Sequence, residues 1–528
     1  MEKIKKYQTQ IILSLIIILQ IIVYVLVGLQ KSYIHIDEGY SLGLIHYDTL
    51  DISYNEDFCN NWHDKEYYND YLTIGKDEAK NFKPVYENQK NDVHPPLYYL
   101  LLRIAYSFHL GEFSKWPGLI LNMFLLTLST IMLYKVAKKI FNNEEYAIMV
   151  ALGGAIVTST LETCMLMRMY ALNSLNILII TYLHLNIWNE EKFKIRDLVL
   201  IGISAVIGSL THYYFLIFLF ILYVICMARY IIRKQYDKAI KYTITMVIAA
   251  VCSLLIFPYS FKHIFMGYRG QGAFSNISKL DVMLNGLTGY LRLLLEHVFN
   301  NLAIYVIFAM IGLLAYRVIR DRKVTFTSKN SLVWVAAIPA LSYFAIVAMV
   351  SPYIEIRYLA PVTLLLFLLG IYLVKTVLNT VIKDEKKVKF IVLGLIVAII
   401  LAPIVTGQKP MYVYKDFQDI VYNVENDYKL PALYVFNTEQ NRFMDDIYLF
   451  SKIDESYILD FKDMSKEKVQ EAFKDKNIEK GILVFINGGQ ENDDELEEIK
   501  EATNLDKVDY LKRLNACDVY YVHSSENK

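Results

Sequence analysis

The sequence predicts an all-α polytopic membrane protein with about eleven transmembrane helices, additional interfacial helices and a small C-terminal α/β domain. Of its 528 residues, 55% are hydrophobic and 20% are charged, and the mean hydropathy is +0.30. Soluble domains are about 45–50% apolar and about 25% charged. Apolar runs of membrane-spanning length recur through residues 1–407, whereas residues 408–528 show short alternating segments instead.

Eleven apolar runs come close to the roughly 20 residues that a helix needs to cross about 30 Å of hydrocarbon. The first run follows Lys3, Lys5 and Lys6 without a cleavage site after it, so we expect an uncleaved span. The long stretch Leu198 to Ile232 is divided at a polar break, Thr211-His212-Tyr213. The expected spans are 11–29, 117–134, 146–161, 169–188, 198–211, 214–230, 242–259, 301–316, 332–350, 358–377 and 388–405.

The placement of lysine and arginine orients these spans, because cytoplasmic connections are enriched in both residues. Basic residues occur at the N-terminus and on alternate connections, whereas the three short connections between them hold only Arg168 and Arg357. The pattern predicts a multi-pass cell-membrane protein with a cytoplasmic N-terminus. The basic connections are 135–139, 192–196, 229–241, 317–329 and 375–389.

Two domains are expected. Residues 1–407 form the transmembrane domain, including an extracytoplasmic loop at 30–96, and residues 408–528 form an extracytoplasmic α/β domain. Leu97 to Leu110 and Leu280 to Val298 are expected as interfacial amphipathic helices, with their apolar residues on one stripe. In the C-terminal domain, strands are expected at 432–437, 481–487 and 519–523 and helices at 465–474 and 493–503.

Charge and cysteine patterns exclude several classes. Residues 1–407 carry 38 Lys and Arg against 28 Asp and Glu, and residues 408–528 carry 16 against 26. Because the basic residues interrupt long apolar runs and form no stripe on a polar surface, nucleic acid is excluded as a partner. The five cysteines lie far apart without metal-binding or disulfide-framework spacing.

Unusual polar residues gather at the outer ends of the spans. Ionisable residues at a membrane edge typically line a cavity or a substrate path. Each of these residues could also have an ordinary structural role, as a loop carboxylate, a helix start or an arginine that reaches lipid headgroups. Five separate segments nevertheless converge on one face: Asp37-Glu38, His94-Pro95-Pro96, Arg168 with Tyr170, His212-Tyr213 and Arg357-Tyr358.

Acids and cations together at a bilayer surface suit glycosyl transfer from a lipid-phosphate donor. A departing phosphate needs cations rather than a protonating acid, so one carboxylate suffices as base. We expect Asp37 to be the base and Glu38 an organiser, through hydrogen bonds or a metal. Arg168, His212 and Arg357 are candidates to hold the donor phosphate, and His94 to position either substrate.

At these residues the chain resembles the GT-C class of polytopic glycosyltransferases. It is most similar to the protein O-mannosyltransferase group, glycosyltransferase family 39, and to aminoarabinose-transferase and RgtA-like bacterial enzymes. The resemblance implies a GT-C-like fold, a catalytic acidic pair at Asp37 and Glu38, and a polyprenyl-phosphate monosaccharide as donor. Its motifs are Asp37-Glu38, Asp92 to Leu97, Arg168 to Leu172, Thr211-His212-Tyr213 and Arg357-Tyr358 with Pro361.

The expected function is an inverting hexosyltransferase that moves a sugar from a polyprenyl-phosphate donor to an extracytoplasmic glycan, lipid or protein. Donor and substrate binding are expected at His94, Arg168, Tyr170, His212, Tyr213, Arg357 and Tyr358. No cofactor is certain, although Glu38 and His94 are candidate ligands for a divalent cation. Two alternatives stay open: a polysaccharide polymerase or ligase, and a transporter of lipid-linked sugars.

Overall fold

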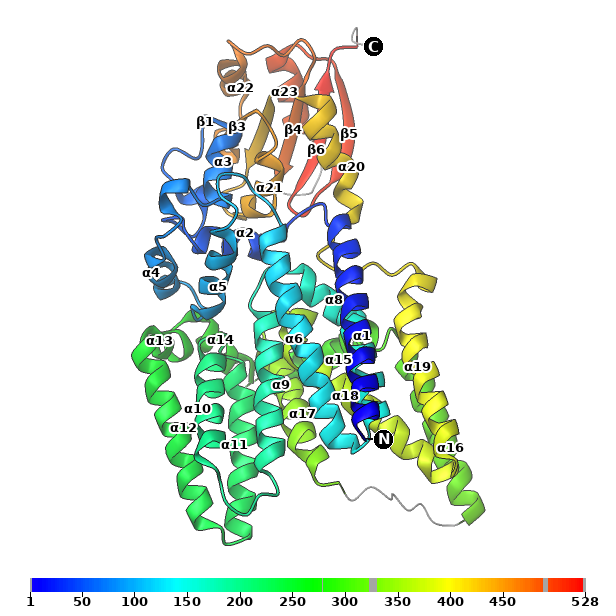
Figure 1. Cartoon of the computed structure of the whole chain (residues 1–528). Coiled ribbons are helices and arrows are strands. Elements are labelled where there is room, and N and C mark those ends of the chain that lie inside the picture. The colour runs from blue at the N-terminus through cyan, green and yellow to red at the C-terminus, as the bar shows by residue number, and fades with distance from the viewer. Residues whose placement is uncertain (1, 278, 322–329, 488–491, 526–528) are drawn as a thin grey trace.

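The computed structural model describes residues 2–277, 279–321, 330–487 and 492–525. A helical bundle forms one part of the molecule, and a β-sheet with flanking helices lies beyond one end of it (Figure 1). The first helix, α1, begins within the bundle and runs toward the sheet (Figure 1). Arg322, Lys323 and Lys329, part of an expected basic connection, lie outside the described residues.

Helices occur at all eleven expected spans. In the described residues, eight are long and apolar enough to cross a membrane, and the pair α7 and α8, bent by 47°, would make a ninth. The helices are α1 (Glu2–Gln30), α6 (Trp116–Phe141), α7 (Glu144–Ile156), α8 (Thr158–Met165), α9 (Tyr170–Ile187), α10 (Ile195–Ser209), α11 (Phe215–Ile232), α12 (Tyr236–Ile256), α16 (Leu302–Asp321), α17 (Leu332–Val350), α18 (Ala360–Val381) and α19 (Glu385–Thr406).

Helix α9 is less apolar than a lipid-exposed span, and its position among other helices allows it to contain polar residues. Asn173, Asn176, Thr181 and His184 are all buried. Asn176 accepts a hydrogen bond from Ser204 Oγ at 2.8 Å, and His184 lies 2.8 Å from the Tyr242 hydroxyl. Interhelical hydrogen bonds thus satisfy Asn176 and His184 within the bundle.

Short helices lie near the end of the bundle that faces the sheet (Figure 1). The expected interfacial segments form α5 (Leu97–Tyr106) and α15 (Leu280–His297), while α13 (Tyr259–Phe265) and α14 (Tyr268–Ile277) precede α15. Helix α5 buries Tyr98, Tyr99 and Leu102 and therefore packs inside the protein. The loop at 30–96 is also structured: it contains α2 (Ile36–Leu44), α3 (Lys65–Leu72), α4 (Lys83–Asn91) and the 3-10 turns Ile52–Tyr54 and Lys76–Glu78.

The sheet has six strands in the order β1-β3-β2-β4-β6-β5. Strand β2 pairs in parallel with β3 and β4, and the remaining pairs are antiparallel. Strand β1 (Asn61–Asp64) comes from the loop at 30–96, which was expected on the outer side and is called the outer loop below, so this loop and the C-terminal region share one sheet. The other strands are β2 (Ala432–Phe436), β3 (Glu455–Asp460), β4 (Ile482–Asn487), β5 (Lys507–Arg513) and β6 (Cys517–His523).

Side chains alternate between the two faces along each strand, and other elements pack against both faces. Leu433 and Val435 pack with α22 (Lys466–Phe473) and α23 (Asp493–Thr503), whereas Tyr434 and Phe436 pack into the core shared with the outer loop. Burial on both faces explains why every residue of β2 is buried. The remaining short helices are α20 (Gln418–Tyr422), α21 (Ile447–Phe450), the π-turn η5 (Asn423–Tyr428) and the 3-10 turns η3 (Ile356–Tyr358), η4 (Lys415–Phe417), η6 (Phe443–Asp445) and η7 (Phe461–Asp463).

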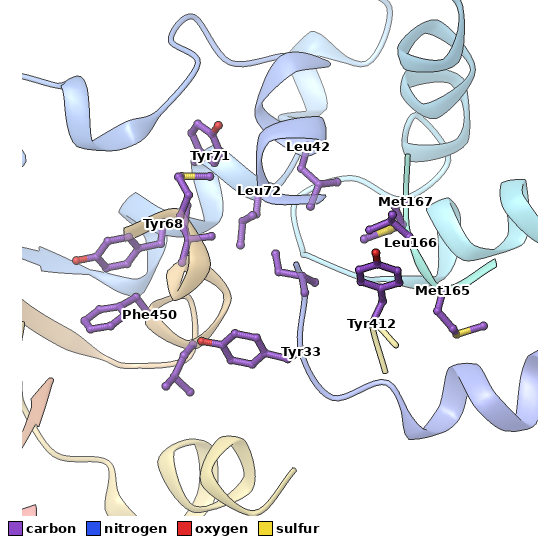
Figure 2. Close-up of a cluster of buried hydrophobic side chains, with 14 of the residues drawn as sticks. Tyr33, Leu42, Tyr68, Tyr71, Leu72, Met165, Leu166, Met167, Tyr412 and Phe450 are labelled. Carbon is purple, nitrogen blue, oxygen red and sulfur yellow. The ribbon is translucent and has the colours of Figure 1, made fainter. Parts of the chain in front are cut away.

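One hydrophobic core joins the outer loop, the bundle and the α/β region. Figure 2 shows Leu42 of α2, Tyr68 of α3 and Phe450 of α21 in the same cluster as Met167, which follows α8. Tyr412, from the segment after α19, belongs to the same cluster. The layer that carries Asp37 is therefore fixed to the membrane helices on one side and to the sheet on the other.

Candidate active site

Helix α2 presents the acidic pair. His35 is its N-cap: the His35 side chain accepts the backbone N–H of Asp37 at 3.1 Å, and Glu38 accepts the backbone N–H of His35 at 2.7 Å. This reciprocal capping box fixes the first turn of the helix. Asp37 and Glu38 therefore leave the helix in different directions, and the positive end of the helix dipole favours both carboxylates.

Glu38 is completely buried and does not line a cavity. Its carboxylate pairs with Lys31 at 2.9 Å and accepts the backbone N–H of Met167 at 3.0 Å. Lys31 also donates to the carbonyl of Tyr412 at 2.6 Å. Glu38 thus connects α2, the link between α8 and α9, and the segment after α19.

Asp37 faces two arginines that are distant in sequence. Its carboxylate forms an ion pair with Arg357, which also pairs with Glu355 at 2.9 Å. Arg168 donates to the backbone carbonyl of Asp37 at 3.4 Å and to the hydroxyl of Ser41 at 3.1 Å. Both arginine side chains are buried, so their charges are weakly screened.

The pKa of Asp37 reflects opposing effects. Burial raises the pKa, but the charges of Arg168 and Arg357 lower it more, so the net pKa lies below the ordinary value of 3.8. Asp37 is therefore ionised throughout the physiological range. Burial likewise lowers the pKa of the neighbouring His35 to about 4, which leaves that imidazole neutral.

His94 lies next to Arg168. Its Nδ1 is 2.9 Å from a carboxylate oxygen of Asp92, and its Nε2 is 3.4 Å from the Arg168 guanidinium. An arginine donor requires Nε2 to be the acceptor, which assigns the proton to Nδ1, where it is donated to Asp92. Burial lowers the pKa of His94, in agreement with a neutral ring.

The remaining expected residues surround this centre. The His212 ring lies 6.0 Å from the His94 ring and 5.7 Å from the Tyr170 ring, and Tyr358 lies 6.3 Å from Tyr170. The Tyr213 hydroxyl is 2.8 Å from Nδ1 of His263. The aromatic residues thus form a wall beside the arginines.

A cavity of about 1190 Å³ collects these side chains. All the expected site residues except Glu38 line it: Asp37, His94, Arg168, Tyr170, His212, Tyr213, Arg357 and Tyr358. Leu216, Ile217, Ile346 and Val350, from α11 and α17, give it an apolar wall. At about 1190 Å³ the cavity exceeds the roughly 300–1,000 Å³ of small-molecule pockets, so it can hold two substrates together.

Several lining residues were missed by the sequence analysis. Arg442, Asp445 and Asn515 come from the α/β region, and Lys409 and Asp416 from the segment after α19. These residues occur in ordinary polar loops, and no spacing motif distinguishes them. Only the packing of the α/β region onto α2 brings them to the cavity.

The two expected metal ligands differ in their relation to the cavity. His94 lines the cavity and Glu38 does not. Among the described residues, no cluster of three or more His, Cys, Asp or Glu side chains has an arrangement that could hold a metal ion. Asp37, Arg168 and Arg357 place a carboxylate and two guanidinium groups at the cavity.

Comparison with known proteins identifies the fold. A family model described as dolichyl-phosphate-mannose-protein mannosyltransferase matches residues 93–258. The structure is similar to that of ArnT from Cupriavidus metallidurans bound to undecaprenyl phosphate, with a TM-score of 0.53, 9% identity, and coverage of 96% of this chain and 97% of that chain. The chain has the GT-C fold.

Other matches are weaker. The apo Archaeoglobus fulgidus oligosaccharyltransferase is similar at 12% identity over 89% of this chain and 69% of that chain, with a TM-score of 0.40. No curated protein matches the sequence. The GT-C fold and its apolar helices make the chain a multi-pass membrane protein. The family match contains His94, Arg168, Tyr170, His212 and Tyr213.

Proposed function

We propose that this protein transfers a monosaccharide from a polyprenyl-phosphate donor to an acceptor hydroxyl. The observation that carries the proposal is the contact of Asp37 with Arg357 and Arg168 in one cavity. This arrangement provides an ionised carboxylate beside two cations, which is what displacement of a phosphate by a hydroxyl requires.

The proposed step is a single inverting displacement. The acceptor oxygen forms a bond to the anomeric carbon while the bond from that carbon to the phosphate oxygen breaks. Asp37 takes the hydroxyl proton, and the electron pair of the broken bond stays on the lipid phosphate. Arg357 and Arg168 hold the resulting phosphate, because guanidinium groups bind phosphate oxygens through paired hydrogen bonds.

The remaining residues have supporting roles in this proposal. His94 and His212 hold the sugar and phosphate by hydrogen bonds, and Tyr170, Tyr213 and Tyr358 shape the wall beside them. Glu38 positions α2 from behind the cavity and does not touch the substrates. The donor class is supported by the named ligand of the ArnT structure, undecaprenyl phosphate, and by the dolichyl-phosphate-mannose description of the matching family model.

We also propose that the cavity faces outside the cell and that the N-terminus is cytoplasmic, as the basic connections indicate. Reporter fusions test this orientation: an alkaline phosphatase fused at residue 407 or 525 becomes active only outside the cytoplasm. A cytoplasmic reporter is expected to be active when fused at the connection near residue 190. The reverse pattern contradicts the orientation.

Transfer is tested with the purified full chain in liposomes that contain undecaprenyl phosphate linked to radiolabelled glucose, mannose, galactose or N-acetylglucosamine. The wild type is expected to attach label covalently to extracted cell-envelope glycans, lipids or proteins. Asp37→Asn is expected to lower the rate about a hundredfold or more. Movement of label across the bilayer without attachment indicates a transporter, and use of diphosphate-linked donors alone indicates a polymerase or ligase.

A further inference from the structure

Arg442 and Asp445 form a second charged centre in the same cavity. The Arg442 guanidinium contacts one carboxylate oxygen of Asp445 through two nitrogens, Nε and Nη2, each at 2.8 Å. Asp445 is buried, whereas half of the Arg442 side chain is exposed. Both residues line the cavity, together with Asn515 from the turn between β5 and β6.

The pair is held close to the proposed base. Turn η6 places Met444 against Gly39 of α2, where an added Cβ would lie 3.0 Å from Met444 Cε. Asp445 follows Met444 directly, and the charge of Asp37 acts on it. Burial raises the pKa of Asp445, Arg442 lowers it, and Asp37 raises it further, with a net increase. The two carboxylates therefore share one enclosed space.

The cavity has two chemically different ends. Its apolar wall, which includes Ile217 and Ile346, comes from α11 and α17, which are long and apolar enough to span a membrane. Its polar end comes from the α/β region and from residues 409–416. A polyprenyl chain fits the apolar wall, which leaves the charged lining from the α/β region, including Arg442 and Asp445, to contact the second substrate.

The chemistry of the polar end favours one class of acceptor. Arg442 with Asp445, and Lys409 with Asp416, are ion pairs whose charges cancel locally. Together, Arg442, Asp445 and the Asn515 amide offer several hydrogen-bond donors and acceptors and no net charge, which suits neutral hydroxyl groups. Lys415, next to Asp416, also lines the cavity and adds one positive charge to its lining. Arg442, Asp445 and Asn515 lie on turns, so they offer side chains rather than strand backbone to a second substrate.

We infer that Arg442, Asp445 and Asn515 form the acceptor subsite, and that the acceptor is a neutral glycan. The inference rests on the proposed function, since the bound glycan is an acceptor only if the protein transfers a sugar to it. Binding of the glycan can nevertheless be measured without any donor. The α/β region thus supplies acceptor recognition, and the transmembrane part supplies the base and the donor phosphate site.

The test uses the detergent-solubilised full chain on an array of neutral oligosaccharides, with serine- and threonine-containing peptides on the same array. The wild type is expected to bind a subset of the glycans. Arg442→Gln, Asp445→Asn and Asn515→Ala are each expected to weaken that binding about tenfold, which corresponds to the loss of one hydrogen bond. Asn515→Ala is included because this side chain is only half-buried, so its replacement is not expected to disturb folding.

Arg513→Gln is the matched control. Arg513 forms another Arg–Asp pair of the same region, with Asp518 at 2.7 Å, and does not line the cavity. This variant is expected to bind glycans like the wild type. Unchanged glycan binding in all three subsite variants, or binding of peptides instead of glycans, overturns the inference.

Kinetics separate this inference from the proposed function. With a glycan that binds and a donor that is turned over, the subsite variants are expected to raise the ratio of acceptor KM to donor KM about tenfold. An equal change in both KM values contradicts an acceptor subsite. If no polyprenyl-phosphate sugar is turned over, the proposed transfer fails, while donor-free glycan binding still decides whether the subsite exists.

Discussion

Lys31 and Glu38 form an ion pair of 2.9 Å in which both side chains are completely buried. Glu38 is adjacent in sequence to Asp37, whose side chain instead lines the cavity and contacts Arg357. Two neighbouring acids therefore have different surroundings. One is enclosed by hydrogen bonds that define the position of α2, and the other faces the substrates.

Replacement of Glu38 by Gln is expected to lower stability strongly. It leaves the Lys31 ammonium buried without a counter-charge, which costs about 3–5 kcal/mol of unfolding free energy. Thermal unfolding of the detergent-solubilised protein measures the effect. Asp37→Asn serves as the comparison and is expected to unfold near the wild-type temperature, because Arg357 keeps its partner Glu355. Equal destabilisation of the two variants contradicts this division of roles.

The acid limb of the pH–activity profile is expected to move when Arg357 is replaced by Gln. Burial raises the pKa of Asp37, and the charges of Arg168 and Arg357 lower it more. Removing the Arg357 charge raises the pKa, so the carboxylate becomes protonated, and activity is lost, at a higher pH than in the wild type. The measurement is kcat/KM against pH, which reports on the free enzyme. An unchanged acid limb argues against Asp37 as the base, and Arg513→Gln provides the control.

Asp446 is expected to make stability fall as the pH rises. Burial and the nearby Asp445 raise its pKa to about 7, although the hydroxyls of Tyr33 and Tyr434 donate to its carboxylate. Because the folded pKa exceeds the unfolded value of 3.8, the folded state binds more protons between about pH 4 and pH 7. The free energy of unfolding should decrease across that window by at most about 4 kcal/mol.

The variant Asp446→Asn isolates this contribution. Its stability is expected to change less with pH than that of the wild type, as followed by chemical denaturation at pH 5, 6, 7 and 8. Parallel pH dependence in the two proteins contradicts the assignment.

Helix α15 is expected to tolerate no side chain at Gly286. A Cβ there would lie 1.9 Å from the backbone carbonyl oxygen of Ala348 in α17, so the two helices would have to move apart. Gly286→Ala should therefore lower the unfolding free energy by about 1–3 kcal/mol or more. Gly312→Ala in α16 is the matched control, because nothing lies within 4 Å of its added Cβ. Thermal unfolding compares them, and equal transition temperatures contradict the packing described for α15.

The membrane part was predictable because its signal is local. A helix in lipid satisfies its own backbone, so an apolar run of sufficient length nearly suffices to specify it. Helix α9 shows the limit of this rule, since its buried Asn173 and Asn176 reduce its apolar character. The strands near 432–437, 481–487 and 519–523 were predicted by the same kind of local pattern.

Other strands were missed for physical reasons. Strand β1 has four residues, Asn61–Asp64, and exists because it pairs with β3, nearly four hundred positions away. Strand β5, at the other edge of the sheet, contains Lys507, Lys512 and Arg513 and therefore lacks the apolar alternation of a core strand. Pairing with the distant strand β3 determines β1, whereas β5 forms by pairing with β6, which follows it after a short turn.

Hydropathy and charge act over short stretches of chain, so the amino-acid sequence alone predicts the membrane spans, their orientation and five polar segments at one membrane surface. The contact of Asp37 with Arg357, the enclosure of Glu38 with Lys31, and the entry of Arg442 and Asp445 into the same cavity are visible only in the folded protein. The physical reason is that these roles depend on burial and on partners that are distant in sequence. Asp37 and Glu38 are adjacent acids, and no local sequence pattern distinguishes which of them is buried and which lines the cavity.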